Sequence, residues 1–254
     1  MAHQYEERYI AFIDILGFSL LVEQSEADAN LLGRLTSVLE DVRMYKKIEE
    51  HNDAFGSSHP LHFFQNMFKM TTFSDNILIS TKINMIGLGE IIFISAVICN
   101  RLLHQGIFTR GAISKGKLIH TNTIVLGPSL IRAYNLQKDA AIYPRILIDE
   151  NIVHDIDALA NQGGSPDLRR KDFDGLWHLH ILHPSILELN SQTSKSEYTA
   201  LNNHDYMALG RQEIENAFRS NADNLAVKAK IGWLARYFNE YAVSFGLPKI
   251  QVME

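Results

Sequence analysis

The chain has 254 residues, of which 46% are hydrophobic and 21% are charged, and its formal net charge is −5. This composition is ordinary for a globular protein with one large domain, or with a compact domain and a helical extension. Because the chain has no lysine- or arginine-rich block, the composition disfavours a nucleic-acid partner, whose phosphates require clustered cations. The single cysteine, Cys99, excludes an intrachain disulfide and indicates a buried, inert thiol.

The amino-terminal part of the chain predicts a strand followed by helices. Residues 8–15, RYIAFIDI, form a nearly continuous apolar run that is typical of a buried strand. Residues 17–50 have apolar side chains at helical spacing, and residues 51–60 have the composition of a loop.

The next segments predict a β-hairpin and a long helix. Residues 61–70 and 76–80 flank the polar turn TTFSD at 71–75, as the two strands of a hairpin would. Residues 83–105 are nearly all apolar, but Glu90 and several polar breaks favour a core helix over a membrane span. The remaining expected elements are strands at 107–120, 143–149 and 176–182, helices at 127–141 and across 203–245, and a loop at 161–175.

The order strand, helix, hairpin, helix, strand predicts an α+β fold, a ferredoxin-like βαββαβ palm with a C-terminal helical extension. We expect an antiparallel or mixed sheet with helices packed on one face. The expected domain covers residues 1–182, and the extension covers residues 183–254 and packs on this domain or on a dimer. The polar, acidic amino terminus is unlike a signal peptide, so we expect a cytoplasmic protein without a membrane partner.

Two aspartates stand where this fold brings separate segments together. Asp14 ends the first strand and Asp75 lies in the hairpin turn, so their side chains can be neighbours. Neighbouring carboxylates repel each other unless they share a cation, and Mg²⁺ or Mn²⁺ suits such ligands. Two ions about 3.5–4 Å apart can activate an attacking oxygen and neutralise a leaving phosphate.

The segment LGFS after Asp14 supplies a candidate phosphate site. Gly17 allows the backbone to approach a ligand, and the N–H groups that open the next helix favour an anion. Together with the carboxylates, this segment predicts a nucleoside-triphosphate site. A structural interpretation stays open, because an aspartate before a glycine is also a common cap and SDN is also ordinary turn sequence.

These motifs resemble those of class III nucleotide cyclases. FIDILGFS resembles the family's first metal-binding motif, and TTFSDNILIS resembles its second hairpin, with Ser74-Asp75 in place of Gly-Asp. FTRGAISKGKL and VLGPSLIRAYNL resemble the strand and the glycine-led helix that follow, so the resemblance covers about residues 8–150.

The resemblance implies that Asp14 and Asp75 ligate two metal ions, with the carbonyl oxygen of Ile15 as a further ligand. It also implies a two-fold homodimer in which each composite site takes groups from both subunits. The backbone groups implied to hold the triphosphate are those of Leu16, Gly17 and Phe18.

The chain departs from the purine-specific members of that family. Thr71 and Ile124 occupy the two base-selecting places, and Ile131 and Asn135 occupy the places of the transition-state Asn and Arg, with Arg132 one position away. GPSLIRAYNL, YPRILID and KIGWLARYFN together are similar to bacterial pyrimidine cyclases of anti-phage signalling systems. Those enzymes make cyclic UMP or cyclic CMP, which triggers a separate effector protein.

In this interpretation a lyase forms the cyclic nucleotide and releases pyrophosphate. The candidate catalytic residues are Arg110, Asn135 and Arg145. Thr71, Phe73 and Asn135 are the candidate base contacts, and Tyr134 is a further candidate for substrate binding. For Arg145 a structural ion pair is an equally good explanation, and packing or capping also explains Tyr134 and Asn135.

Two other functions fit the sequence. One is a catalytically inactive cyclase-like module that binds a nucleotide or a protein, and the other is a different two-metal palm-type nucleotidyltransferase. His178 and His180 alternate on a predicted strand, but no third ligand accompanies them, so we expect them to be structural. We expect the aromatic stripe around Trp233 and Tyr237 to pack in the core.

Overall fold

The computed structural model describes residues 4–50, 68–161, 166–193, 195–196, 199–221 and 223–252. The strands are β1 (Glu6–Ile15), β2 (Phe68–Phe73), β3 (Asn76–Lys82), β4 (Thr109–His120), β5 (Val125–Leu126), β6 (Ile146–Ile148), β7 (Arg169–Lys171), β8 (Trp177–Leu179), β9 (Lys195–Ser196) and β10 (Thr199–Ala200). The helices are α1 (Phe18–Ser25), α2 (Ala29–Glu50), α3 (Met85–Leu103), α4 (Pro128–Ala140), α5 (Glu150–Asn161), α6 (Pro184–Thr193), α7 (Asn203–Ser220) and α8 (Leu225–Ala242), with a 3₁₀ turn, η2 (Val243–Phe245).

The first four long strands form the predicted ferredoxin-like arrangement. They lie in the order β2-β3-β1-β4, and each neighbouring pair is antiparallel. β6 continues the sheet in parallel beside β4, and β8 and β7 extend it by antiparallel pairing. The prediction of an α+β fold with a mixed sheet and C-terminal helices is therefore confirmed.

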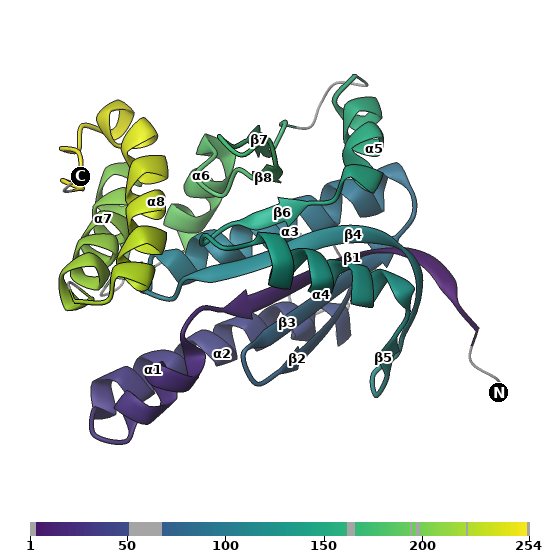
Figure 1. Cartoon of the computed structure of the whole chain (residues 1–254), viewed down its shortest axis with the longest axis horizontal. Helices are drawn as coiled ribbons and strands as arrows, with labels where there is room; N and C mark the ends of the chain where they lie inside the picture. Colours follow the sequence, from purple (N-terminus) through teal and green to yellow (C-terminus); the bar gives the residue numbers. More distant parts are fainter. Residues whose placement is uncertain are drawn as a thin grey trace.

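Helices cover both faces of the sheet (Figure 1). α3 lies on one face, where Ile13 of β1 joins the main core, and α4 lies on the other, where Ile10 packs with Leu118 and Ala133. Our expectation of helices on one face is wrong, because the pattern of residues 127–141 predicts a helix but not the face that it covers. β1 is apolar on both sides since it lies between these two layers.

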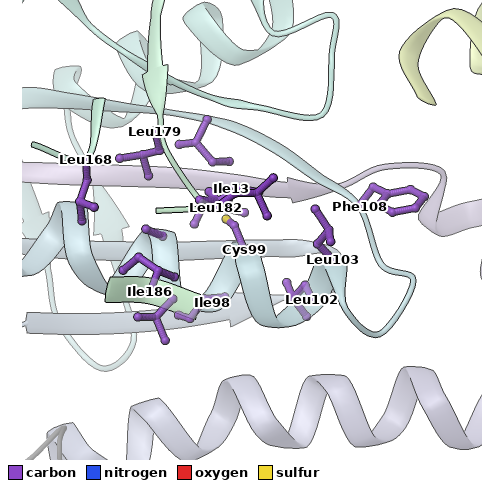
Figure 2. Packing of buried hydrophobic residues seen from close by; sticks show 14 of the residues in the cluster. Ile13, Ile98, Cys99, Leu102, Leu103, Phe108, Leu168, Leu179, Leu182 and Ile186 are labelled. Carbon is purple, nitrogen blue, oxygen red and sulfur yellow. The ribbon is translucent and has the colours of Figure 1, made fainter. Parts of the chain in front are cut away.

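The main core continues from the sheet into the C-terminal helices. Figure 2 shows Ile13 of β1 near Cys99 of α3 and Leu182, which precedes α6. Buried side chains of α6, α7 and α8 belong to the same cluster, while the domain boundary at residue 182 stays a prediction. Burial raises the pKa of the Cys99 thiol to about 12, as expected for an inert core cysteine.

α3 is the one helix among the described residues that is long and apolar enough to cross a bilayer. Most of its residues are buried inside the fold, in contact with the sheet and with α6. The interpretation of residues 83–105 as a core helix agrees with this burial.

Several element bounds differ from those that the sequence predicts. Residues Thr71–Phe73 belong to β2, so the hairpin turn narrows to Ser74 and Asp75. β7 lies within the expected loop at 161–175, where it pairs with β8. The expected loop at 51–60 and the 61–67 part of the hairpin lie outside the described residues.

Candidate active site

Asp14 lies near the end of β1, between two neighbouring strands. The sheet register places Asn76 of β3 on one side of Asp14 and Arg110 of β4 on the other. Because side chains alternate along a strand, Ile13 and Ile15 enter the main core and Asp14 projects toward α4. The Asp14 side chain is 14% exposed, so it is largely shielded but open to a small ligand.

A tight turn brings Asp75 to the same place. The backbone N–H of Ile15 donates to the carbonyl oxygen of Asp75 at 3.1 Å, which fastens the hairpin tip to the end of β1. Ser74 has a φ of 53°, in the left-handed region that favours glycine. The Asn76 side-chain amide donates to Oδ1 of Asp75 at 3.0 Å and orients the carboxylate.

The Asp14 and Asp75 carboxyl groups lie close enough to influence each other. Burial raises the pKa of Asp14, the Arg110 guanidinium opposes this rise, and Asp75 adds to it through a side-chain hydrogen bond and like charge. Nε of Arg110 donates to Oδ2 of Asp14 at 2.8 Å, and Nε2 of Gln137 donates to the same oxygen at 3.1 Å. The two predicted carboxylates thus lie at one site, together with the Arg110 guanidinium.

The donor atoms at this site suit a hard divalent cation. Two carboxylates are present, and no group of three or more His, Cys, Asp or Glu side chains that could hold a metal occurs among the described residues. Mg²⁺ and Mn²⁺ fit a site with few carboxylates, since water and phosphate oxygens complete their coordination. The hydrogen bonds that Arg110 and Gln137 donate to Asp14 both reach Oδ2.

The phosphate segment follows directly. Gly17 is the N-cap of α1 and has a φ of 71°, a conformation that glycine adopts without strain. The N–H of Leu16 donates to the carbonyl oxygen of Phe108 at 2.9 Å, so this amide already has a partner within the fold, and a phosphate contact by the Leu16 backbone stays a prediction. The N–H groups of Gly17 and Phe18 stay candidates at the helix amino terminus.

The predicted base contacts of the hairpin lie on β2. Oγ1 of Thr71 is 3.1 Å from Nε2 of His120, and Nδ1 of His120 is 2.8 Å from Oγ of Ser80. Nε of Arg8 donates to the same Ser80 hydroxyl at 3.0 Å, so a polar row crosses the sheet from β1 to Thr71. Phe73 is 76% exposed near the hairpin tip.

α4 contributes one residue that the sequence analysis missed. Ala133 and Gln137 form its buried side, and only the packed structure reveals that the Gln137 amide reaches Asp14. Tyr134 is half-exposed and makes an edge-to-face contact with Phe12, with ring centroids 5.6 Å apart. Asn135 is exposed on the side of α4 turned away from the sheet.

Arg145 does not take the catalytic place predicted for it. Its side chain is buried on the α3 side of the sheet, and its guanidinium forms ion pairs with Asp172 and Asp174. The guanidinium carbon also lies 5.8 Å from the centre of the Trp233 ring. Because Asp14 projects from the opposite face, the structural interpretation of Arg145 holds and the catalytic one is corrected.

Arg132 and the two strand histidines also have structural partners. Nη2 of Arg132 donates to Asp149 at 2.8 Å. Burial tends to raise the pKa of Asp149, but the hydrogen bonds that its carboxylate accepts keep this pKa below the ordinary value. Nδ1 of His180 is 2.8 Å from the Tyr237 hydroxyl, and burial lowers the pKa of His178 to about 4. Both rings belong to the aromatic packing against α8.

The topology and the paired aspartates define the class of site: a carboxylate pair at a strand end of an α+β palm. No protein-family model matches the chain, and no curated protein matches it. Among solved structures, the chain resembles the guanylyl cyclase Cya2, at 12% identity and a TM-score of 0.42, over 80% of this chain and all of that one. A likeness this distant carries no argument about activity, which we draw from the site itself.

Proposed function

We propose that this chain is a nucleotide cyclase that converts a pyrimidine nucleoside triphosphate into a 3′,5′-cyclic monophosphate and pyrophosphate. The observation that carries the proposal is the meeting of Asp14 and Asp75 at one end of β1, next to the amino terminus of α1. A carboxylate pair holds divalent ions, and a helix amino terminus holds phosphate, so the two together suit a metal-bound triphosphate.

Asp14 and Asp75, with the Ile15 carbonyl oxygen, would hold Mg²⁺ or Mn²⁺ in the proposed reaction. When bound, two such ions activate the attacking hydroxyl and neutralise charge on the phosphates. Arg110 contributes positive charge at the same place, because it already lies 2.8 Å from Asp14. Gln137 holds the Asp14 carboxylate in a fixed orientation.

The chemistry requires no nucleophile from the protein. The ribose 3′-oxygen forms a bond to the α-phosphorus, the bond from that phosphorus to the bridging oxygen breaks, and pyrophosphate leaves while the hydroxyl proton passes to solvent. The chain's own residues contribute mainly by positioning the triphosphate and by stabilising negative charge.

A pyrimidine base is favoured by the residues on the hairpin. Thr71, which occupies a place for base selection, is uncharged and is held by His120. Phe73 offers an exposed ring on which a base can stack. The resemblance of the sequence to anti-phage pyrimidine cyclases supports a role in antiviral signalling, in which the product acts on a separate effector protein.

A homodimer with composite sites completes the proposal. Large apolar side chains are exposed on the elements that lie on the α4 side of the sheet, where a second subunit would cover them. These exposed side chains are Phe73 of the hairpin, Leu126 of β5, and Ile131 and Tyr134 of α4. Asn135 also points outward from this helix, as a group that serves the partner's site would.

The test is to incubate the purified protein with each of the four nucleoside triphosphates and Mn²⁺ or Mg²⁺, and to separate the products by chromatography. We expect a cyclic pyrimidine product, and we expect Asp14→Asn and Asp75→Asn to lower its formation by more than about 100-fold. A purine product would overturn the base assignment, and product formation that survives both substitutions would overturn the site.

The Arg110–Asp14 ion pair favours a second candidate, a cyclase-like module that binds a nucleotide without turning it over. In that function Arg110 neutralises Asp14 permanently, so that no ion is required there. Nucleotide binding without any product, unchanged in Asp14→Asn, would support this candidate over the enzyme.

A further inference from the structure

A cavity of about 330 Å³ lies on the α3 side of the sheet, opposite to the face from which Asp14 projects. α3 and α5 form most of its wall, and the chain around Leu168 completes it. The wall is mainly apolar, with side chains such as Ile92, Phe93 and Ile156. Its volume is in the range of sites that bind small molecules.

Glu90 of α3 lines this cavity and is only 2% exposed. Neither of its carboxylate oxygens accepts a hydrogen bond from any residue that the structure describes. A buried carboxyl group without a partner is costly, and burial accordingly raises the pKa of Glu90 to about 7. A ligand that donates hydrogen bonds or brings positive charge would remove this cost.

The other charged residues at the cavity do not satisfy Glu90. Arg169 lines the same cavity, but its guanidinium is paired with Asp157 at 2.6 Å and with Asp167 at 3.0 Å, and it lies over the Trp177 ring. Asp167 also lines the cavity, and its pairing with Arg169 offsets its charge. The cavity therefore combines a mainly apolar wall with the carboxyl group of Glu90, which has no partner among the residues that the structure describes.

We propose that this cavity is a binding site for a small amphipathic amine, with the ammonium group at Glu90 and the apolar part among the side chains of α3 and α5. An ammonium donates charge-assisted hydrogen bonds to a carboxylate, which are stronger than bonds from a neutral donor. The apolar part of the ligand gains by leaving water. This site is independent of the nucleotide site, since its residues lie on the other face of the sheet.

The binding test uses phenethylamine as the probe and phenethyl alcohol as its neutral counterpart, in calorimetric titrations at about pH 8, where Glu90 is ionised. We expect saturable binding of the amine at one site and at least tenfold weaker binding of the alcohol. Glu90→Gln, which keeps the side-chain size, is expected to weaken amine binding at least tenfold.

Gly89→Leu provides a matched variant that fills the cavity. Gly89 lines the cavity, and a Cβ atom there meets no other atom within 4 Å. We expect Gly89→Leu to abolish binding of both probes. No saturable binding to the wild-type protein, or equal amine binding by wild type and Glu90→Gln, would overturn the proposal.

Methyl NMR of the wild-type protein tests the location without any variant. We expect phenethylamine to shift the methyl signals of Ile92 and Ile156, which line the cavity, and to leave Ile10 on the α4 side unchanged. Shifts confined to other parts of the chain would contradict the assignment.

Discussion

At the scale of single residues, charged side chains divide into those that face a ligand site and those that hold the fold. Arg110 and Asp14 form a partly exposed pair beside Asp75, where a ligand can compete for either partner. Arg145, by contrast, is almost fully buried between two carboxylates and the ring of Trp233. The two arginines therefore differ in burial and in their ion pairs, although both interrupt an apolar strand sequence.

Arg145→Leu is expected to destabilise the protein by about 3–5 kcal/mol, because it leaves Asp172 and Asp174 without their buried cation. Arg110→Leu is the matched comparison: we expect it to reduce product formation while changing the free energy of unfolding by about 1 kcal/mol or less. Urea unfolding measures both changes. An Arg145→Leu protein of normal stability and abolished turnover would contradict the structural role.

Glu90 makes stability depend on pH. Its folded pKa of about 7 lies above the ordinary value of 4.5, so protonation favours the folded state. The free energy of unfolding is therefore highest below about pH 4.5, and it falls as the pH rises through about 7 and the buried Glu90 ionises. We expect Glu90→Gln to be more stable than wild type by about 1–3 kcal/mol at about pH 8, and similar to it at about pH 4.

Urea unfolding at both pH values tests this expectation, with the exposed Glu23→Gln as the control. Glu23→Gln should change stability equally at the two pH values. A Glu90→Gln variant that is less stable than wild type at about pH 8 would show that Glu90 has a favourable partner in the folded state.

At the scale of elements, two glycines of α3 that lie two positions apart have different surroundings. Gly87 lies against the end of β3, where a Cβ atom would be 2.1 Å from the carbonyl oxygen of Lys82. Gly89 faces open space, and a Cβ atom there meets nothing within 4 Å. The first glycine is required for the approach of helix and strand, and the second only lowers helix stability.

Gly89→Ala is expected to stabilise the protein by about 0.5–1 kcal/mol through helix propensity. Gly87→Ala is expected to destabilise it by about 1–3 kcal/mol, because backbone atoms must move. The two variants differ by two positions in one helix, so thermal unfolding compares them directly. Equal effects of both substitutions would contradict the close contact at Gly87.

The elements also show which features of the fold can be predicted from sequence. The apolar run of β1 and the helical spacing of α3 are local patterns, and both elements are confirmed. β2 extends through Thr71–Phe73, which the sequence analysis assigned to the turn, because threonine and phenylalanine favour strands and all three residues pair with β3.

In the candidate site, too, some features can be predicted from the sequence and others cannot. Asp14 and Asp75 can be placed together from the strand order alone, because the hairpin tip and the end of β1 share one edge. Gln137 and His120 cannot, since their contacts depend on which helix face and which strand neighbour the folded chain presents. The partners of Arg145 come from segments about 30 residues away, and no local pattern identifies them.

At the scale of the whole molecule, the two faces of the sheet differ in what they carry. The α4 side carries the carboxylate pair and exposed apolar side chains, and the α3 side carries the main core and the cavity at Glu90. The C-terminal helices α7 and α8 pack together at one end of the sheet (Figure 1), so they leave the α4 side accessible to a second subunit.

The proposed dimer predicts that the rate per subunit falls on dilution. Ile131→Glu places a charge at an apolar position that is 60% exposed, so we expect a monomer of normal stability and low activity.

A mixture of the Asp14→Asn and Asn135→Ala proteins should recover about a quarter of wild-type activity, because half of the dimers contain one intact composite site. Sedimentation velocity and turnover at several concentrations check this; concentration-independent turnover by a monomer would contradict it.

Binding of Mn²⁺, followed by electron paramagnetic resonance in the presence of UTP or CTP, tests most directly whether Asp14 and Asp75 form one cation site. Asp28→Asn is the control, since Asp28 caps the start of α2 and asparagine caps equally well. We predict that Asp14→Asn and Asp75→Asn each weaken Mn²⁺ binding more than about tenfold, while Asp28→Asn leaves it unchanged. Mn²⁺ binding that is unaffected by both substitutions would contradict the account.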